Sequence, residues 1–428
     1  MRRTSMKAST KAATLLAVVG LFAAGCGSSS DNNSSDPASN KSSGESSAPA
    51  ASGTLTVWAD ETRTPIITEI GKQLTDDKGV TVKVVQKDFG TLKDEFTTQA
   101  PSGKGPDILI GAHDWIGGLV ESGGIAPVEL GDKAAELQDV AVEAFTYDGQ
   151  TYALPYAVEN IALVRNTDLA PGAPKSWDDM VGTGKKLVAQ KKAKLPIAIQ
   201  QDPTNGDPYH LFPLQQSFGS SIFATSPEGG YDASQLTIGD ENGIAFAKWL
   251  SQAAKSKVVN PSVTYDIATG EFAKGKVPYI ITGPWALAAF DDGGVNYAVE
   301  QIPSPGGEPA VPFVGVQGFM VSAHSENAVA ANDFVLNYLG AEEAQQMLFE
   351  AGGRPSAMTS VFEASKNDPI YEGFGSVGAN GVPQPNIPAM DAVWAEWGKT
   401  EMAIIKGGDP VKLWSNMTKK IQKTIDGS

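Results

Sequence analysis

Apolar and polar residues follow two different periods along the chain from residue 53 onward. Apolar and β-branched residues at every second position predict strands, and apolar residues recurring every three or four positions predict helices. The first segments read strand, helix, strand, helix, strand, an order typical of a parallel α/β sheet. They cover residues 53–58, 64–74, 80–85, 92–100 and 106–111.

The same mixture of periods returns after residue 160 and becomes mostly helical after residue 326. No internal repeat is visible. We therefore predict two α/β lobes with a helix-rich C-terminal part. The later strands are expected at 163–164, 196–199 and 277–281, and the later helices at 242–254, 266–274, 328–339, 341–351 and 411–425.

The N-terminus has the pattern of an export signal. Four basic residues precede an uncharged apolar run at residues 12–24, which is shorter than the roughly 20 residues that a membrane-spanning helix needs. A signal peptide over residues 1–25 is predicted. Ala23-Ala24-Gly25-Cys26 resembles the lipobox of bacterial lipoproteins, which implies that Cys26 is lipidated and begins the mature chain. The pair Arg2-Arg3 also resembles a twin-arginine signal, so the Sec and twin-arginine routes both stay open.

Residues 26–52 are predicted to be a flexible tether. After Cys26 they are dominated by Ser, Asn, Asp, Ala and Pro and contain no aromatic or large aliphatic residue, so they cannot offset the entropy cost of folding. A coil of this length spans about 28 Å. The protein is thus expected at the outer face of the cytoplasmic membrane, held there by its lipid anchor only.

Composition excludes several classes of function. The formal net charge is −16, and an acidic surface disfavours nucleic acid and anionic lipid as partners. A single cysteine excludes an internal disulfide. Three histidines without metal-site spacing predict no metal site and no cofactor. Residues 179–186 and 374–378 fall short of a phosphate loop and a nucleophile elbow because each lacks the leading glycine.

Aromatic residues near predicted strand ends suggest a sugar site. Trp285 follows the strand at 277–281, and Trp394 and Trp397 lie three apart on one helical face. Ligands of α/β folds bind at the carboxyl ends of strands. Pyranose faces stack on rings while sugar hydroxyls need carboxylates, and carboxylates stand at comparable places. They are Asp60, Glu61, Asp114, Glu159 and Asp207, whereas Trp58, Trp177, Trp249 and Trp414 are assigned to packing.

Motifs along the whole chain from Gly53 resemble the maltose/maltodextrin-binding proteins of ABC importers, in extracellular solute-binding protein family 1. These motifs are 105–114, 152–159, 206–209, 272–275 with 281–285, 312–316, and 385–390 with Trp394. The resemblance implies two lobes, each a mostly parallel sheet flanked by helices, joined by a hinge of several crossing segments. Lobe 1 would comprise residues 54–157 and 319–365, and lobe 2 residues 162–313 and 371–428.

The resemblance also implies roles for individual residues. Asp114, Glu159 and Asp207 would accept hydrogen bonds from sugar hydroxyls, and Tyr209, Trp285 and Trp394 would stack on pyranose faces. Three positions depart from the family pattern: Gly111 replaces a tryptophan, and Trp115 and Gly398 replace arginines. The remaining candidate ligand contacts are Asp60, Glu61 and Arg63 after the first strand, Trp115 and Trp397 as replacement rings, and Gln317, for which a hinge-packing role is equally open.

The predicted function is therefore delivery of maltose or maltodextrin-type α-glucans to an ABC permease with its cytoplasmic ATPase. The protein is expected to be a monomer and not an enzyme. Two alternatives stay open: a binding protein for a cyclodextrin, galactoside or β-linked glycan, or a secreted glycosidase that uses Glu159 and Asp207 as acid and base. Replacing Trp285 or Trp394 by alanine should weaken binding by about 1–3 kcal/mol through lost ring burial.

Overall fold

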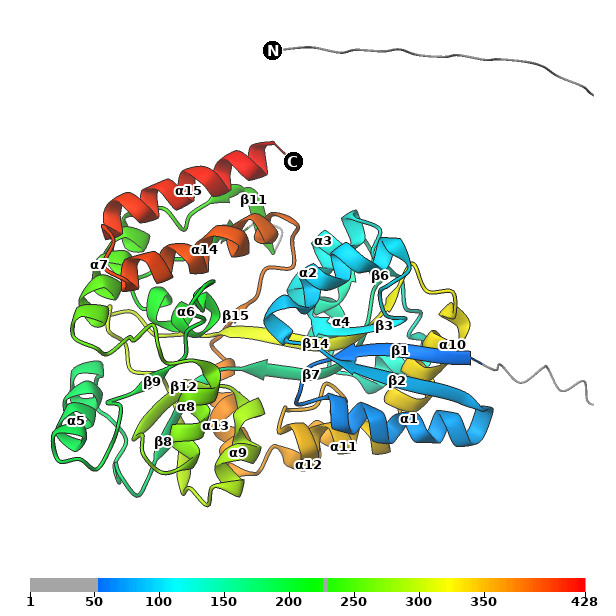
Figure 1. Cartoon of the computed structure of the whole chain (residues 1–428), viewed down its shortest axis with the longest axis horizontal. Coiled ribbons are helices and arrows are strands. Elements are labelled where there is room, and N and C mark those ends of the chain that lie inside the picture. The colour runs from blue at the N-terminus through cyan, green and yellow to red at the C-terminus, as the bar shows by residue number, and fades with distance from the viewer. Residues whose placement is uncertain (1–52, 226–229, 428) are drawn as a thin grey trace, which may run out of the picture. The chain divides into compact units, whose positions relative to one another are not determined.

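The structure is a computed structural model that describes residues 53–225 and 230–427 (Figure 1). These residues belong to one compact unit. The predicted signal peptide, Cys26 and the tether lie outside the described residues. Within the described ranges, none of the helices combines the length and the apolar composition needed to cross a bilayer.

The first sheet forms around β1 (Gly53–Ala59). Its strand order is β15-β14-β3-β1-β2, and β4 and β7 also pair with β14. β1 runs parallel to β2 and β3, whereas β14 runs antiparallel to β3, β4 and β7. The other strands are β2 (Val80–Gln86), β3 (Ile108–Ala112), β4 (Ile125–Ala126), β7 (Leu154–Asn160), β14 (Phe313–Ser322) and β15 (Val382–Pro383).

The second sheet has the order β13-β8-β12-β9. β8 is antiparallel to both of its neighbours, while β12 and β9 are parallel. Two hairpins, β5–β6 and β10–β11, complete the strands. Their bounds are β8 (Ala162–Asn166), β9 (Ala198–Ile199), β12 (Tyr279–Thr282), β13 (Tyr297–Glu300), β5 (Thr146–Tyr147), β6 (Gln150–Thr151), β10 (Phe223–Thr225) and β11 (Tyr231–Leu236).

The helices match the predicted segments closely. The expected helix at 328–339 begins as α10 (Ala328–Asp333) and continues as a π-helical turn over Phe334–Leu339. The other helices are α1 (Thr64–Lys78), α2 (Phe89–Gln99), α3 (Ile116–Glu121), α4 (Asp139–Ala144), α5 (Trp177–Ala189), α6 (Pro208–Gln216), α7 (Glu241–Lys255), α8 (Tyr265–Ala273), α9 (Leu287–Asp292), α11 (Glu342–Gly352), α12 (Thr359–Ser365), α13 (Pro369–Gly378), α14 (Ala389–Ile405) and α15 (Pro410–Asp426).

Buried apolar side chains separate into cores on either side of the crossing strands. One core takes residues from 55–157 and 316–361, and two others take residues from 161–313 and 374–421. The two-lobed α/β fold is confirmed. Its sheets contain more antiparallel pairing than the sequence pattern predicted, because β14 runs opposite to β3, β4 and β7, and β8 runs opposite to β12 and β13. The lobe boundaries themselves stay a prediction.

The connection between the lobes is made by strands that lie side by side. β7 and β14 pair along most of their length, from Val314 opposite Asn160 to Phe319 opposite Leu154 (Figure 1). β14 begins with Phe313 in a core of lobe 2 and continues with Phe319 in the core of lobe 1. The short strand β15 pairs with the first residues of β14. This arrangement places the ends of several strands at the junction of the lobes.

Candidate ligand-binding site

Aromatic side chains from four segments of lobe 2 gather at this junction. Trp394 on α14 stacks on Trp397, with ring centroids 5.4 Å apart, and lies 6.4 Å from Phe313 at the start of β14. Tyr209 on α6 lies 6.1 Å from Phe313 and 6.3 Å from Trp285, which follows β12. Trp394, Tyr209 and Trp285 are each only partly buried, so their rings remain accessible for stacking.

A hydrogen bond joins an aromatic ring of lobe 2 to a carboxylate of lobe 1. Asp114 is the second residue after β3 and is 3% exposed. Its Oδ2 accepts a hydrogen bond of 3.0 Å from Nε1 of Trp394. Its Oδ1 is buried and has no partner among the described residues. Because buried oxygens are normally hydrogen-bonded, Oδ1 has the capacity to accept a further hydrogen bond.

Trp115 and Trp397 are both buried. Trp397 is 0% exposed, and Trp115 is 8% exposed and packs on Phe89 at 5.1 Å. The six-membered ring of Trp115 covers Gly111 so closely that a Cβ there would lie 2.2 Å from it. In this structure the two rings therefore support neighbouring residues, and their contact with a ligand stays a prediction.

Asp207 caps the helix that carries Tyr209. Its Oδ1 accepts from the backbone N–H of His210 at 3.1 Å and lies 2.9 Å from His210 Nδ1, while its Oδ2 accepts from Gln200 Nε2 at 2.6 Å. An aspartate at this position satisfies free N–H groups of the first turn. The carboxylate is thus fixed at the start of α6, two residues before Tyr209.

Glu159 near the end of β7 is held by two neighbours. Its Oε2 pairs with Nε of Arg354 at 2.8 Å, and its Oε1 accepts from Gln317 Nε2 at 3.0 Å. Gln317 on β14 in turn accepts from Arg63 Nη1 at 3.2 Å, and Arg63 pairs with Asp60 at 3.1 Å. All five side chains are buried. The sequence analysis named four of them separately and missed Arg354.

Glu61 differs from its neighbours because its side chain is exposed. It directly follows Asp60, whose pKa is lowered: burial alone would raise it, but the positive charges of Arg63 and Arg354 outweigh burial together with hydrogen bonds. The structure therefore brings Asp60 and Arg63 into the buried polar network, and Glu61 remains outside it.

His113 and Asp114 are adjacent buried groups with opposite pH dependence. Burial lowers the pKa of His113 from 6.5 to about 4, and raises the pKa of Asp114 from 3.8 to about 6. As the pH falls from 6.5 to 4, the unfolded chain protonates His113 before the folded one does, which destabilises the fold. Over nearly the same range the folded chain protonates Asp114 first, which stabilises it. The two effects, each about 3 kcal/mol, largely cancel.

Asp114→Asn should remove this compensation. The variant is expected to lose about 3 kcal/mol of unfolding free energy between pH 7 and pH 4 relative to the wild type, because only the His113 effect remains. Urea unfolding at pH 4, 5, 6 and 7 measures this. His113→Gln is the matched control and should change in the opposite direction. Parallel curves for all three proteins would contradict the assignment.

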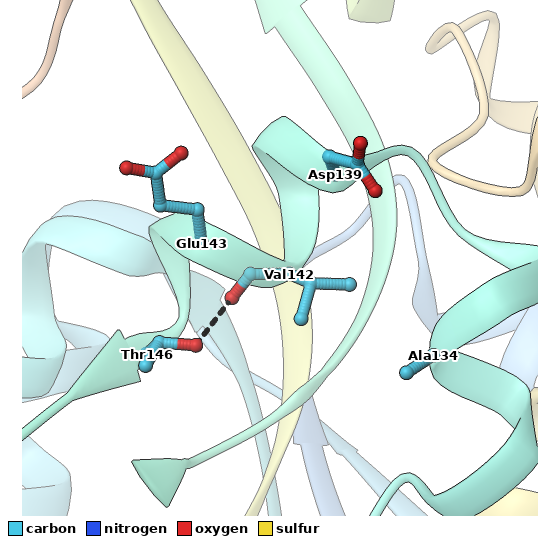
Figure 2. Close-up of a pocket in the computed structure, with 5 residues that line it drawn as sticks. All are labelled: Ala134, Asp139, Val142, Glu143 and Thr146. Carbon is cyan, nitrogen blue, oxygen red and sulfur yellow. Dashed lines mark hydrogen bonds between the residues drawn. The ribbon is translucent and has the colours of Figure 1, made fainter. Parts of the chain in front are cut away.

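The remaining features of the described chain offer no competing site chemistry. Among the described residues, no group of three or more His, Cys, Asp or Glu side chains could hold a metal ion. Figure 2 shows a pocket beside α4 that contains none of the predicted site residues. It is lined by Ala134, Asp139, Val142, Glu143 and Thr146 and has no aromatic ring for a sugar to stack on.

Two α/β lobes that are linked by adjacent strands, with rings and carboxylates meeting where the lobes join, are typical of solute-binding proteins. Residues 69–373 match the family model described as "Bacterial extracellular solute-binding protein". The chain belongs to this family, whose members bind solutes.

Individual relatives agree with the family. A "Maltooligosaccharide ABC transporter solute-binding lipoprotein" of Streptococcus pneumoniae R6 is 29% identical over 79% of this chain and 81% of its own. A "Galactooligosaccharide-binding protein" of Bacillus subtilis is 27% identical over 89% of this chain and 88% of its own. The solved structure of a Thermus thermophilus maltotriose binding protein bound with maltotriose has a TM-score of 0.79 at 30% identity, covering 87% of this chain and 100% of that one.

Proposed function

We propose that this protein is the substrate receptor of an ABC importer and binds maltodextrin-type α-glucan oligosaccharides between its lobes. The observation that carries the proposal is the contact of Trp394 with Asp114 across the lobe junction, where Asp114 keeps a buried, vacant oxygen. A pyranose offers an apolar face for such a ring and hydroxyls for such a carboxylate. The names of the Streptococcus pneumoniae and Thermus thermophilus relatives support α-glucans as the ligand class.

In this proposal the two lobes supply different contacts. Trp394, Trp285 and Tyr209 of lobe 2 stack on sugar faces, and Asp114 of lobe 1 accepts hydroxyl hydrogen bonds. Asp207 does the same beside Tyr209. Glu159, Gln317 and the Asp60–Arg63 pair form the floor of the site, where their mutual hydrogen bonds fix the polar groups before ligand binds.

The cellular setting follows from the N-terminal sequence. Cys26 carries a lipid, and the tether keeps the folded part at the outer face of the cytoplasmic membrane, where the permease receives the sugar. The lipoprotein relative in Streptococcus pneumoniae supports this placement. The receptor returns its ligand unchanged, and the bonds that occupy both oxygens of Glu159 argue against its use as a glycosidase acid.

A galactooligosaccharide is the second candidate ligand. The Bacillus subtilis relative with that name covers more of this chain than the maltooligosaccharide relative does. At Gly111, where the family pattern has a tryptophan, Trp115 fills the space beside the glycine, so this part of the protein departs from the family pattern and leaves the second candidate open.

A fluorescence titration tests the ligand class. Maltotriose, a longer maltodextrin and a cyclodextrin should each change the tryptophan emission in a saturable way at about micromolar concentration, because Trp285 and Trp394 lie at the site. A galactooligosaccharide and a β-linked glucan serve as comparisons. Recovery of intact sugar after incubation tests for hydrolysis. A response to the galactooligosaccharide alone would transfer the proposal to the second candidate, and silence from every sugar would reject both.

A further inference from the structure

Arg354 lies where the two lobes touch at the back of the site. It follows Gly352 and Gly353, which end α11 in lobe 1, and its side chain is 5% exposed. Gly353 has φ +64°, and a Cβ there would lie 2.7 Å from the backbone oxygen of Pro284 in lobe 2. The backbone of this loop therefore rests directly against the segment that carries Trp285.

The guanidinium of Arg354 makes contacts in both lobes. Its Nε pairs with Oε2 of Glu159 on the connecting strand β7 at 2.8 Å, and its Nη1 donates to Oγ1 of Thr62 in lobe 1 at 3.1 Å. Toward lobe 2, Cζ lies 5.7 Å from the ring centroid of Trp285. A guanidinium within about 6 Å of a tryptophan ring is attracted to its face. The planar fork can pair with a carboxylate and lie over a ring at once in a fixed geometry, which a compact ammonium group reproduces only in part.

We propose that Arg354 is a positioning residue that fixes the Glu159 carboxylate and holds the Trp285 ring of the opposite lobe, so that it stabilises the closed arrangement of the lobes. The expected effect of Arg354 on sugar affinity rests on the proposed function. Its expected effect on closure of the lobes does not depend on any sugar. Opening of the lobes would separate Arg354 from Trp285 while leaving its bonds to Thr62 and Glu159 intact, since Thr62 belongs to lobe 1 and Glu159 lies on β7 only two residues after Ala157 of the lobe 1 core.

Arg165 provides a matched control. It is also a buried arginine, and its guanidinium pairs with Glu300 at 2.6 Å. Both partners lie on neighbouring strands of lobe 2, β8 and β13. Arg165→Gln therefore removes an ion pair of the same kind without touching the lobe junction.

The first readout is closure of the unliganded full-length protein, carrying Cys26→Ser so that it stays free of lipid. Small-angle X-ray scattering should give a larger radius of gyration for Arg354→Gln than for the wild type or Arg165→Gln, and Arg354→Lys should lie between. Thermal unfolding of each variant checks that the fold is intact. Equal radii for the wild type and Arg354→Gln would overturn the proposal.

The second readout is a double-mutant cycle in maltotriose affinity. Arg354→Gln and Trp285→Leu should each weaken binding, and the double variant should be about ten-fold tighter than the product of the single effects predicts, because both remove the same contact. Independent effects would overturn the coupling. If the wild type binds no sugar but Arg354→Gln still enlarges the radius, the sugar proposal fails and the closure role stands.

Discussion

Trp394→Ala is expected to weaken maltotriose binding by about 2.5–6 kcal/mol. Loss of ring burial against the sugar accounts for about 1–3 kcal/mol. Loss of the Nε1 donor leaves the buried Asp114 carboxylate without its hydrogen bond, which costs about 1.5–3 kcal/mol more. The total exceeds the sequence-based expectation, because only the structure pairs this ring with Asp114. Isothermal titration calorimetry measures the difference.

Two comparisons separate the contributions. Trp394→Phe keeps an aromatic face and loses the donor, so it should show only the part due to the donor, about 1.5–3 kcal/mol. Trp249→Phe is the matched control: Trp249 packs against Trp177 and Phe246 within lobe 2, so its replacement should leave affinity unchanged. Equal affinities of Trp394→Ala and the wild type would remove this ring from the site.

Gly398→Arg, which restores the residue type of the family pattern, is expected to destabilise the protein by about 3 kcal/mol or more. A Cβ at Gly398 would lie 2.1 Å from the backbone oxygen of Asn205, and one at Gly206 would lie 2.1 Å from the oxygen of Gly398. Both clashing atoms are backbone oxygens, so neither can rotate away as the end of a side chain could. The loop would have to move away from α14, and it carries Asp207. Sugar affinity should fall together with the urea midpoint.

Gly182→Ala is the control for this substitution. Gly182 also lies inside a helix, α5, but a Cβ there meets nothing within 4 Å. Alanine should stabilise that helix by about 0.5–1 kcal/mol through its higher propensity and leave affinity unchanged. A Gly398→Arg protein as stable as the wild type would show that the loop at residues 202–207 is not held by this contact.

Local sequence determined most of the secondary structure. The helix predicted at 64–74 extends to Lys78 as α1, with Pro65 near its start and Gly79 in the left-handed conformation at its end. The strand predicted at 106–111 begins two residues later and runs to Ala112. These segments could be predicted because each buries one of its faces. The spacing of apolar residues within the segment itself therefore shows whether it is a helix or a strand. The direction in which strands pair could not be predicted from local sequence, because β14 pairs with β3 although about 200 residues separate them in the chain.

The candidate site divides in the same way. The sequence alone indicated which rings and carboxylates follow strands, and the export signal, lone cysteine and acidic composition depend on no fold. Only the tertiary structure decided which of these groups meet, because burial and pairing depend on residues distant in the chain. In the folded chain, Trp397 is buried and stacks on Trp394, and Trp115 packs against Gly111. Arg354 pairs with Glu159, which is 195 positions away in the sequence.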